Sequence, residues 1–375
     1  MKFTATPKNA YSRAKSLFEK LFASVLSAIF FALTFCLSAC GAGVGEQKHF
    51  TAFKNTDVTV QAREKTLSAA AEKEITDLLS RLNSEFSATV TESTTYKINS
   101  AAASEETEIS EEFRLVAKEC QKMRLITRGK FDPSVYPLTL LWKFAPNYPD
   151  PDFSVPTDDE ILTTKTLVGF DKFSFENSAI KTLDGAKLDF GGVLKGYAAD
   201  KIAQIMKADG ITKGYVNVGG SSLYLLSVDN LYIVHPRKKD NILKIKINSA
   251  DLSVSTSGDY EKNYQANGKI YSHIIDPATG HSSESGVASA TVIGKNGLYL
   301  DAVTTALNLF THDFSEPENG ELFKFVKELL NSEEFKDAQI FVVCIRGDQK
   351  QILTNKKQGE DFTLSDNEYS VINVN

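Results

Sequence analysis

Apolar and polar positions alternate along the chain in short runs that predict β-strands. Side chains of a strand point alternately to its two faces, so period-two runs and short apolar runs between polar turns indicate strands. These segments are residues 57–62, 215–218, 232–235, 243–247, 288–293, 339–345 and 351–354. The last two flank Gly347-Asp348, which predicts a hairpin at that point.

Other segments repeat apolar residues every three or four positions, which is the spacing of one face of an α-helix. They are residues 69–83, 111–127, 198–207, 301–310 and 322–330. Gly129 is expected to cap the second of these helices. Its core-facing residues are expected to be Phe113, Val116, Cys120, Met123 and Leu125. Strands and helices interleave without a regular βαβ rhythm, so the pattern predicts a mixed α/β fold.

Polar stretches between these elements predict loops. Residues 84–104 are dense in hydroxyl side chains, and we expect a loop with short ordered pieces there. Residues 145–159 are rich in proline and acidic side chains, which indicates a surface excursion. Residues 180–188 indicate a hairpin that turns at Asp184-Gly185. The acidic tail from Glu360 is expected to be half-ordered.

Residues 253–280 combine strand signals with side chains that can do chemistry. Two strands, 252–256 and 269–275, are predicted around the polar turn 266–268. Asp276-Pro277 then stops the second strand, because proline cannot continue a ladder. His273 and several hydroxyls would lie where strands end, an arrangement typical of active sites. An ordinary surface hairpin is equally compatible with the composition of this segment alone.

The N-terminal pattern is that of a targeting signal. Residues 1–20 are basic, residues 21–35 are almost entirely apolar, and small residues lead to Cys40. The apolar stretch is short for a membrane span, which favours a secretory signal. The segment resembles a bacterial lipobox, which implies cleavage before Cys40 and lipidation of that cysteine. A retained signal anchor, in which Cys40 is incidental, is the alternative.

This pattern predicts a signal peptide (1–39), a lipidated tether (40–48) and one folded domain (49–375). The resemblance implies a protein anchored to the bacterial cell membrane by acyl chains, facing the periplasm or the outside, rather than one that spans the membrane.

Composition and charge narrow the possible functions. The chain has 375 residues, 42% hydrophobic and 24% charged, which is enough for one large or two modest domains. A formal net charge of −6 offers no basic face to a nucleic acid. The spacing of cysteine and histidine does not match a zinc site. Cys120 and Cys344 are expected to be small buried hydrophobes, with a disulfide between them left open.

Residues 188–197, LDFGGVLKGY, place a glycine-rich turn between a predicted strand and a predicted helix. Glycine lets the backbone approach a ligand, and free N–H groups at a helix start suit a phosphate. Lys195 would add a positive charge, and Asp189 could accept from a ribose or a base. The glycine spacing fits neither a Rossmann fingerprint nor a P-loop, and a purely structural turn is the alternative.

Two further segments carry candidate ligands. Asp301 and Thr305 lie four residues apart on a predicted helix, so their oxygens can face one spot. This pair suits Mg²⁺, which keeps waters and borrows phosphate oxygens, although a carboxylate near a helix N-terminus is the plainer interpretation. Residues 130–137 form a proline-punctuated loop ahead of Trp142, which could line an aromatic ligand or fill the core.

In this order, the segments resemble the ApbE family, the FAD:protein FMN transferases. The resemblance runs through FDPSVYPLTLLWKFAP, LDFGGVLKGYAAD, YVNVGGSS, SVSTSGDYE, YSHIIDPATG and LDAVTTAL. It implies an ApbE-like fold of mixed sheets flanked by helices, with an FAD cleft. It also implies an enzyme that moves FMN from FAD to a threonine hydroxyl of a flavoprotein and releases AMP. The implied acceptors are flavoprotein subunits of the Na⁺-pumping quinone reductase or Rnf type.

The same resemblance implies roles for individual residues. His273 matches the family's proposed general base, and such a base is needed because a threonine hydroxyl is a weak nucleophile. Mg²⁺ would be held by the side chains of Asp301 and Thr305 and by the main-chain carbonyl of Gly192. The positions that match FAD contacts are Lys130, Phe131, Asp132, Asp189, Lys195 and Ile275.

Two stretches depart from the family pattern. Residues 53–56 stand where the family has a methionine-glycine-threonine motif, and Thr89 stands near the position of a flavin-stacking tyrosine, with Tyr96 the nearest tyrosine. These changes affect flavin packing rather than the metal or the base. A Mg²⁺-dependent FAD pyrophosphatase with the same site, and a lipoprotein that only binds FAD, are the alternative functions.

Overall fold

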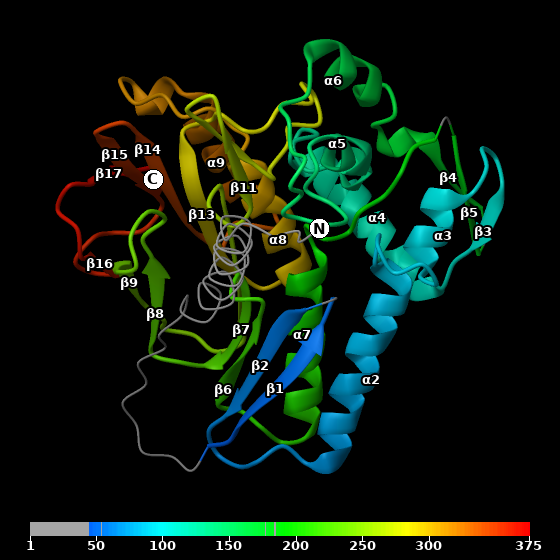
Figure 1. The fold of residues 1–375 in the computed structure, drawn as a ribbon. Helices are drawn as coiled ribbons and strands as arrows, with labels where there is room; N and C mark the ends of the chain where they lie inside the picture. Colours follow the sequence, from blue (N-terminus) through cyan, green and yellow to red (C-terminus); the bar gives the residue numbers. More distant parts are fainter. Residues whose placement is uncertain (1–44, 54, 177, 184) are drawn as a thin grey trace, which may run out of the picture. The chain divides into compact units, whose positions relative to one another are not determined.

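The computed structural model describes residues 45–375, apart from residues 54, 177 and 184 (Figure 1). The predicted signal peptide, Cys40 and Asp184 lie outside the described residues. The first strand begins at Gln47, so regular structure starts inside the predicted tether 40–48. None of the helices in the described part of the chain is both long enough and apolar enough to cross a bilayer.

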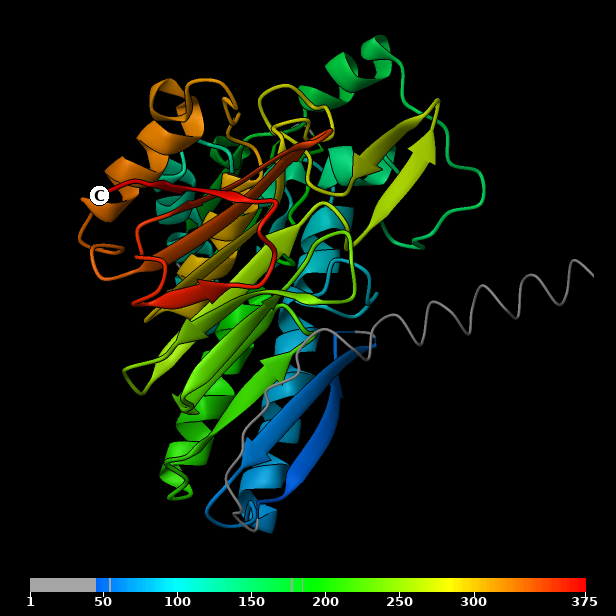
Figure 2. The ribbon, with the colours of Figure 1, turned by 90° about the vertical axis from the view of Figure 1, so that its left-hand side faces the viewer.

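A nine-stranded sheet forms the centre of the domain (Figure 2). Neighbouring strands are antiparallel, except for the parallel pair at the end of the sheet. The two middle strands are buried along nearly their whole length, as expected for a sheet interior. In spatial order the strands are β1 (Gln47–Ala52), β2 (Thr56–Ala62), β6 (Gly214–Val218), β7 (Ser222–Ser227), β10 (Leu252–Gly258), β13 (Val287–Gly294), β14 (Gln339–Arg346), β15 (Gln349–Thr354) and β17 (Ser370–Asn373).

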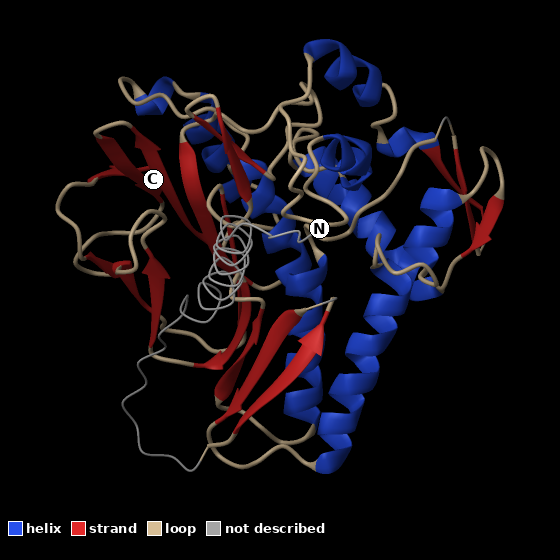
Figure 3. Cartoon of the chain, in the orientation of Figure 1, coloured by secondary structure: helices blue, strands red, loops and turns tan. Residues whose placement is uncertain are grey.

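Helices pack on this sheet and bury its apolar face. The helices are α2 (Ala69–Phe86), α3 (Thr94–Ser100), α4 (Glu111–Ile126), α5 (Tyr136–Leu141), α6 (Asp158–Lys165), α7 (Leu194–Ala208), α8 (Gly297–Leu307) and α9 (Glu321–Leu330). Helix α7 packs on β6 and β7, α8 packs on β10 and β13, and α2 and α4 pack against α7 and α8 respectively. The long helices α2 and α7 lie on one side of the sheet strands (Figure 3). Side-chain hydroxyls of Ser68 and Ser110 cap α2 and α4 by accepting backbone N–H groups of the first turn.

Three small sheets complete the domain. One contains β16 (Phe362–Leu364), β9 (Asn241–Lys246) and β8 (Asn230–Val234). A second contains β3 (Glu106–Glu108), β5 (Ala179–Thr182) and β4 (Phe173–Glu176). The third is the ribbon of β11 (Asn263–Ala266) and β12 (Lys269–Ser272). Short 3₁₀ turns span Pro133–Val135, Phe170–Lys172 and Pro317–Asn319.

The mixed α/β fold is confirmed, and every predicted helix is present with ends shifted by a few residues. The predicted pairing within residues 252–275 is wrong. β10 does not pair with the strand that contains Tyr271, because β10 is in the centre of the large sheet between β7 and β13. The turn at Asn267-Gly268 instead joins β11 and β12. The second strand ends at Ser272, so His273 and Ile275 follow it in an irregular segment.

Four smaller predictions also fail. The hairpin predicted for 180–188 is wrong, because β5 pairs with the preceding β4. Leu125 of α4 is 70% exposed rather than buried. The strands near 232–235 and 243–247 form the small sheet with β16 instead of extending the large one. The tail from Glu360 contains β16 and β17. Cys120 and Cys344 are buried free thiols, as expected for small hydrophobes.

Helices α7 and α8 touch through two glycines. A Cβ atom on Gly196 would lie 2.1 Å from the carbonyl oxygen of Gly297, and one on Gly297 would lie 2.4 Å from the carbonyl oxygen of Gly196. The backbones therefore meet at a distance that only glycine permits. This contact sets how closely the first turn of α7 approaches α8.

We expect Gly196→Ala to lower the free energy of unfolding by about 1–3 kcal/mol, because the added methyl group must push two backbones apart. Thermal or urea unfolding checks this value. Gln204→Ala, on the exposed face of the same helix, is the control and should change stability by less than about 0.5 kcal/mol. Equal effects of the two substitutions would contradict the close-contact explanation.

Candidate active site

The candidate site is built on a face of β10 that carries serines. Ser253, Ser255 and Ser257 are two residues apart, so they share one face of the strand. Ser253 Oγ donates to the Asp200 carboxylate of α7 (2.6 Å), and Ser255 Oγ donates to that of Asp301 on α8. Ser257 Oγ lies 3.0 Å from the hydroxyl oxygen of Thr304. The strand thus supplies hydroxyls to the two helices above it.

Asp301 is a buried carboxylate with neutral partners. It is 4% exposed and accepts hydrogen bonds from the Gly196 N–H (2.7 Å), the Ser222 hydroxyl (2.7 Å) and the Ser255 hydroxyl. Burial raises the pKa of its carboxyl, while the charge of Lys195 and the three hydrogen bonds lower it. A carboxylate buried in this way is stabilised by a nearby cation when it is ionised.

Thr305 and Gly192 lie beside this carboxylate. Thr305 Oγ1 donates to the carbonyl oxygen of Asp301 (3.1 Å), so its lone pairs can still accept or ligate. A Cβ atom on Gly192 would lie 3.2 Å from the Phe131 ring and 3.9 Å from Thr305 Oγ1, so the glycine turn passes closely over this hydroxyl. Carboxylate, hydroxyl and carbonyl oxygens fit Mg²⁺. Among the residues that the structure describes, no three His, Cys, Asp or Glu side chains form a metal-binding group, so a Mg²⁺ ion here would take its other ligands from water and substrate.

The glycine turn leads into α7, as predicted. Asp189 is anchored at both ends, because its N–H donates to the Pro133 carbonyl (2.8 Å) and its Oδ1 accepts from the Gly191 N–H (2.9 Å). Burial raises the pKa of the Asp189 carboxyl, while the Gly191 amide and the Lys262 charge oppose the rise. Lys195 follows on the first turn of α7. Its positive charge opposes the raised pKa of Asp301 and lowers the pKa of His273, so the ammonium acts electrostatically on both groups.

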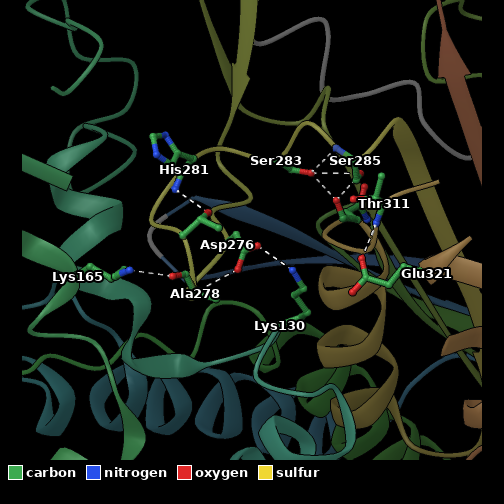
Figure 4. Close-up of polar contacts among 11 residues, drawn as sticks. Lys130, Lys165, Asp276, Ala278, His281, Ser283, Ser285, Thr311 and Glu321 are labelled. Carbon is green, nitrogen blue, oxygen red and sulfur yellow. Dashed lines mark hydrogen bonds and ion pairs between the residues drawn. The ribbon is translucent and has the colours of Figure 1, made fainter. Parts of the chain in front are cut away.

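The side chains of Lys130 and Asp132 are engaged by other residues. Lys130 Nζ pairs with Asp276 Oδ2 at 2.8 Å, which ties the 130–132 segment to the turn after β12 (Figure 4). Asp132 accepts from Arg124 Nε (2.6 Å) and from the N–H of Ser134 (2.8 Å). The predicted FAD contacts of this segment therefore depend on main-chain atoms and on Phe131, which lies under Gly192.

The side chain of Ile275 is also taken up by contacts within the protein. It is 5% exposed and belongs to a small apolar cluster with Leu138, Trp142, Phe144 and Ile161. Its main chain forms an isolated bridge with Ser282. A contact between this residue and FAD would therefore use the main chain, and it remains a prediction.

His273 is half-buried just after β12, with its ring edge toward Phe144 (centroids 6.3 Å apart). Its Nδ1 lies 3.3 Å from the Lys262 carbonyl oxygen, so the tautomer with a proton on Nδ1 is favoured and Nε2 is left as an acceptor. Burial and the charges of Lys262 and Lys195 lower the pKa of His273 to about 3. The imidazole is therefore neutral near pH 7, as a general base requires.

The sequence has Thr89 near the position of the family's flavin-stacking tyrosine, so other tyrosines near the glycine turn are relevant to flavin packing. Burial, followed by the charges of Asp189 and Tyr96, raises the pKa of Tyr136 to about 12. Tyr136 therefore lies in the electrostatic neighbourhood of both Asp189 and Tyr96. Aromatic rings are present at this end of the glycine turn, although Thr89 itself hydrogen-bonds only to the Ser87 hydroxyl in the described residues.

The structure brings Gly192 and Thr305 together with Asp301, and the Gly196 N–H joins the first turn of α7, which carries Lys195, to the Asp301 carboxylate. The charge of Lys195 also acts on His273. Sequence reasoning missed the hydroxyls that hold Asp301, although serines at alternate positions of β10 signalled them. It also missed Lys262, whose place depends on the ribbon β11–β12 being separate from the large sheet.

The segment Ser257–Asp259 acquires a structural role. Ser257 contacts Thr304, and Asp259 pairs with Arg237 through two 2.6 Å contacts. These contacts order the chain at the end of β10, directly before the residues that lead to Lys262.

Comparison with known proteins identifies the family. The model of the ApbE family matches residues 55–315. The FAD:protein FMN transferase of Vibrio cholerae is 31% identical over 246 residues, which cover 64% of this chain and 73% of that protein. The Escherichia coli K12 protein of the same name is 32% identical over 191 residues, which cover 48% of this chain and 54% of the relative.

Solved structures agree with this assignment. The ApbE protein of Thermotoga maritima has a TM-score of 0.69 at 28% identity, covering 80% of this chain and 94% of that one. Flavin transferase ApbE of Vibrio cholerae has a TM-score of 0.68 at 24% identity, covering 83% and 97%, and shows the same fold. The family match includes all candidate residues from Lys130 to Thr305. The chain therefore belongs to the ApbE family.

Proposed function

We propose that this protein transfers FMN from FAD to a threonine hydroxyl of a flavoprotein and releases AMP, with Mg²⁺ as cofactor. The observation that carries the proposal is the buried Asp301 carboxylate, which accepts the N–H of Gly196, the residue after Lys195 at the glycine turn, and lies beside Thr305 on α8. The neutral His273, on which the charge of Lys195 acts, supports it. The relatives named as FAD:protein FMN transferases support the same reaction.

The reaction is a displacement at phosphorus. The threonine oxygen forms a bond to the phosphorus of the FMN phosphate, and the bond from that phosphorus to the bridging oxygen of the pyrophosphate breaks. AMP leaves with the bridging oxygen, and the hydroxyl proton passes to Nε2 of His273. Since the Lys262 carbonyl favours a proton on Nδ1, the lone pair needed for this step is on the other nitrogen.

Charge neutralisation is the second requirement of phosphoryl transfer. Lys195 would bind phosphate oxygens, and the N–H groups of the glycine turn would add donors. Asp301, Thr305 and the Gly192 carbonyl would hold Mg²⁺, which supplies electrostatic stabilisation to the phosphate oxygens when bound. The buried carboxylate with neutral hydrogen-bond partners supports this assignment.

The acceptor and the location are further parts of the proposal. We expect acceptor subunits of the Na⁺-pumping quinone reductase or Rnf type, reached by an enzyme that is anchored through a lipid on Cys40 and faces the periplasm or the outside. The basic and apolar N-terminal sequence supports the anchor.

The test incubates the protein with FAD, Mg²⁺ and a threonine-bearing flavoprotein of this type. We expect mass spectrometry to detect the acceptor with one phosphate-linked FMN, and AMP to appear in equal amount. Free FMN with AMP, and no labelled acceptor, would indicate hydrolysis instead. Flavin binding without AMP would indicate a binding protein.

A further inference from the structure

Lys262 lies between β10 and β11, and the proposed reaction assigns no role to its side chain. Its carbonyl oxygen accepts from the N–H of His273 (3.0 Å) and faces Nδ1 of the same residue (3.3 Å). The hydroxyl of Tyr148 accepts from the N–H of Asn263 and donates to the Asn263 carbonyl, both at 2.9 Å. The main chain of Lys262 is therefore held on both sides.

The side chain is held as well: much of its surface is exposed, while its ammonium group packs over an aromatic ring. Its ammonium lies over the Tyr148 ring, 5.7 Å from the centroid. That ring is fixed by Phe144 and Tyr264, with centroids 5.8 Å and 5.3 Å away. A lysine that would otherwise sample many rotamers is thus directed by an ordered aromatic cluster.

In the part of the chain that the structure describes, Lys262 and Lys195 are cations without a direct carboxylate partner. Within the described residues, neither ammonium forms an ion pair or a hydrogen bond with an acidic side chain. Desolvation and the charge of Lys195 lower the pKa of Lys262, whereas Asp189 and Glu261 act in the opposite direction. Both lysines also act on His273. Cations that no carboxylate in the described residues contacts directly suit an anion that the chain itself does not supply.

We propose that Lys262 is a substrate-binding residue that holds the pyrophosphate of FAD together with Lys195. This inference rests on the proposed function. A pyrophosphate carries anionic oxygens on two phosphorus atoms, and the two lysines come from different elements, α7 and the segment before β11. The hydrogen bond between the two main chains places Lys262 beside His273, the proposed base.

The test measures FAD affinity of Lys262→Met by flavin fluorescence titration, with riboflavin as a phosphate-free probe. Methionine keeps the length of the stem and removes the charge. We expect the Kd for FAD to rise about tenfold, the range of one lost charge-assisted hydrogen bond, while the Kd for riboflavin stays unchanged. Lys262→Arg, which keeps the charge, should restore FAD affinity to near the wild-type value.

Lys244→Met is the matched control, because Lys244 lies over the ring of Tyr232 (5.9 Å) on the small sheet away from His273. It should leave both affinities unchanged. The inference is overturned if Lys262→Met binds FAD like the wild type, or if FAD and riboflavin weaken equally. If the wild type neither labels an acceptor nor releases AMP but FAD affinity still depends on Lys262, the proposed function fails and the phosphate contact stands.

Discussion

Replacing Asp301 with asparagine is expected to slow AMP release from FAD about a thousandfold. The carboxylate is the charged member of the proposed Mg²⁺ ligand set, and asparagine keeps its shape without the charge that would hold the cation. A titration of AMP release with Mg²⁺ measures the effect. Because burial raises the pKa of Asp301, protons compete with the metal at higher pH than they would at an exposed carboxylate, so the Mg²⁺ needed for half-maximal rate should increase as pH falls.

Asp200→Asn provides the matched control. Asp200 belongs to α7 and accepts from Ser253 Oγ (2.6 Å) and the Gly297 N–H (2.7 Å), so it occupies a similar layer between β10 and the helices. This variant should keep the wild-type Mg²⁺ dependence. Thermal unfolding of both variants separates loss of fold from loss of metal. An Asp301→Asn enzyme with the wild-type Mg²⁺ titration would disprove the metal assignment.

His273→Ala is expected to lower kcat for flavin transfer by at least about a hundredfold, the usual contribution of a general base, and to leave the KM for FAD nearly unchanged. His281→Ala is its control, because His281 is exposed and its main-chain carbonyl, not its ring, accepts the Asp276 N–H (2.9 Å). Acceptor labelling under saturating FAD gives kcat directly. A large rise in KM with unchanged kcat would make His273 a binding residue instead of a base.

The pH profile tests the same residue independently. Burial and two lysine charges lower the pKa of His273 to about 3, so the neutral base is already present between pH 5 and 8 in the free enzyme. The rate constant kcat/KM should therefore show no acid limb near pH 6.5 from this group. Bound pyrophosphate offsets both lysine charges and favours the protonated ring, so the acid limb in kcat should lie at higher pH than that in kcat/KM. An acid limb that persists in His273→Ala would assign it to another group.

The elements with strong local patterns could be predicted from the sequence. The helix α4 has apolar residues at Phe113, Val116 and Met123 and a glycine that ends it, and these local signals suffice. The prediction that Leu125 is buried was wrong because the buried stripe of α4 ends at Met123, before the helix ends at Ile126. The mixed α/β class could also be predicted, because segments with helical spacing alternate irregularly with segments of strand spacing. The structure has helices and strands in that mixed order.

The pairing of strands could not be predicted in the same way. The predicted partners, β10 and the strand that became β12, are close in sequence, yet β10 pairs with β7 and β13, whose contacts are long-range. Local hairpin signals say nothing of such partners. The same limit hid Lys262, since its contact with His273 depends on β11 and β12 pairing with each other as a separate ribbon. The pair Asp301 and Thr305 could be predicted from the sequence because one helix carries both residues.

The serine face of β10 has a consequence for folding fidelity. A shift of one residue in its pairing would turn Val254 and Thr256 toward the helices and the serines away from them. Asp200 and Asp301 would then lose hydroxyl donors while still buried, at a cost of about 1–3 kcal/mol for each unsatisfied group. An all-apolar strand would penalise such a slip less, because one buried aliphatic side chain replaces another. The serine hydroxyls that bind Asp200 and Asp301 thus also disfavour the shifted register. A chain that folds with the correct register therefore already has these hydroxyls in position at the two carboxylates.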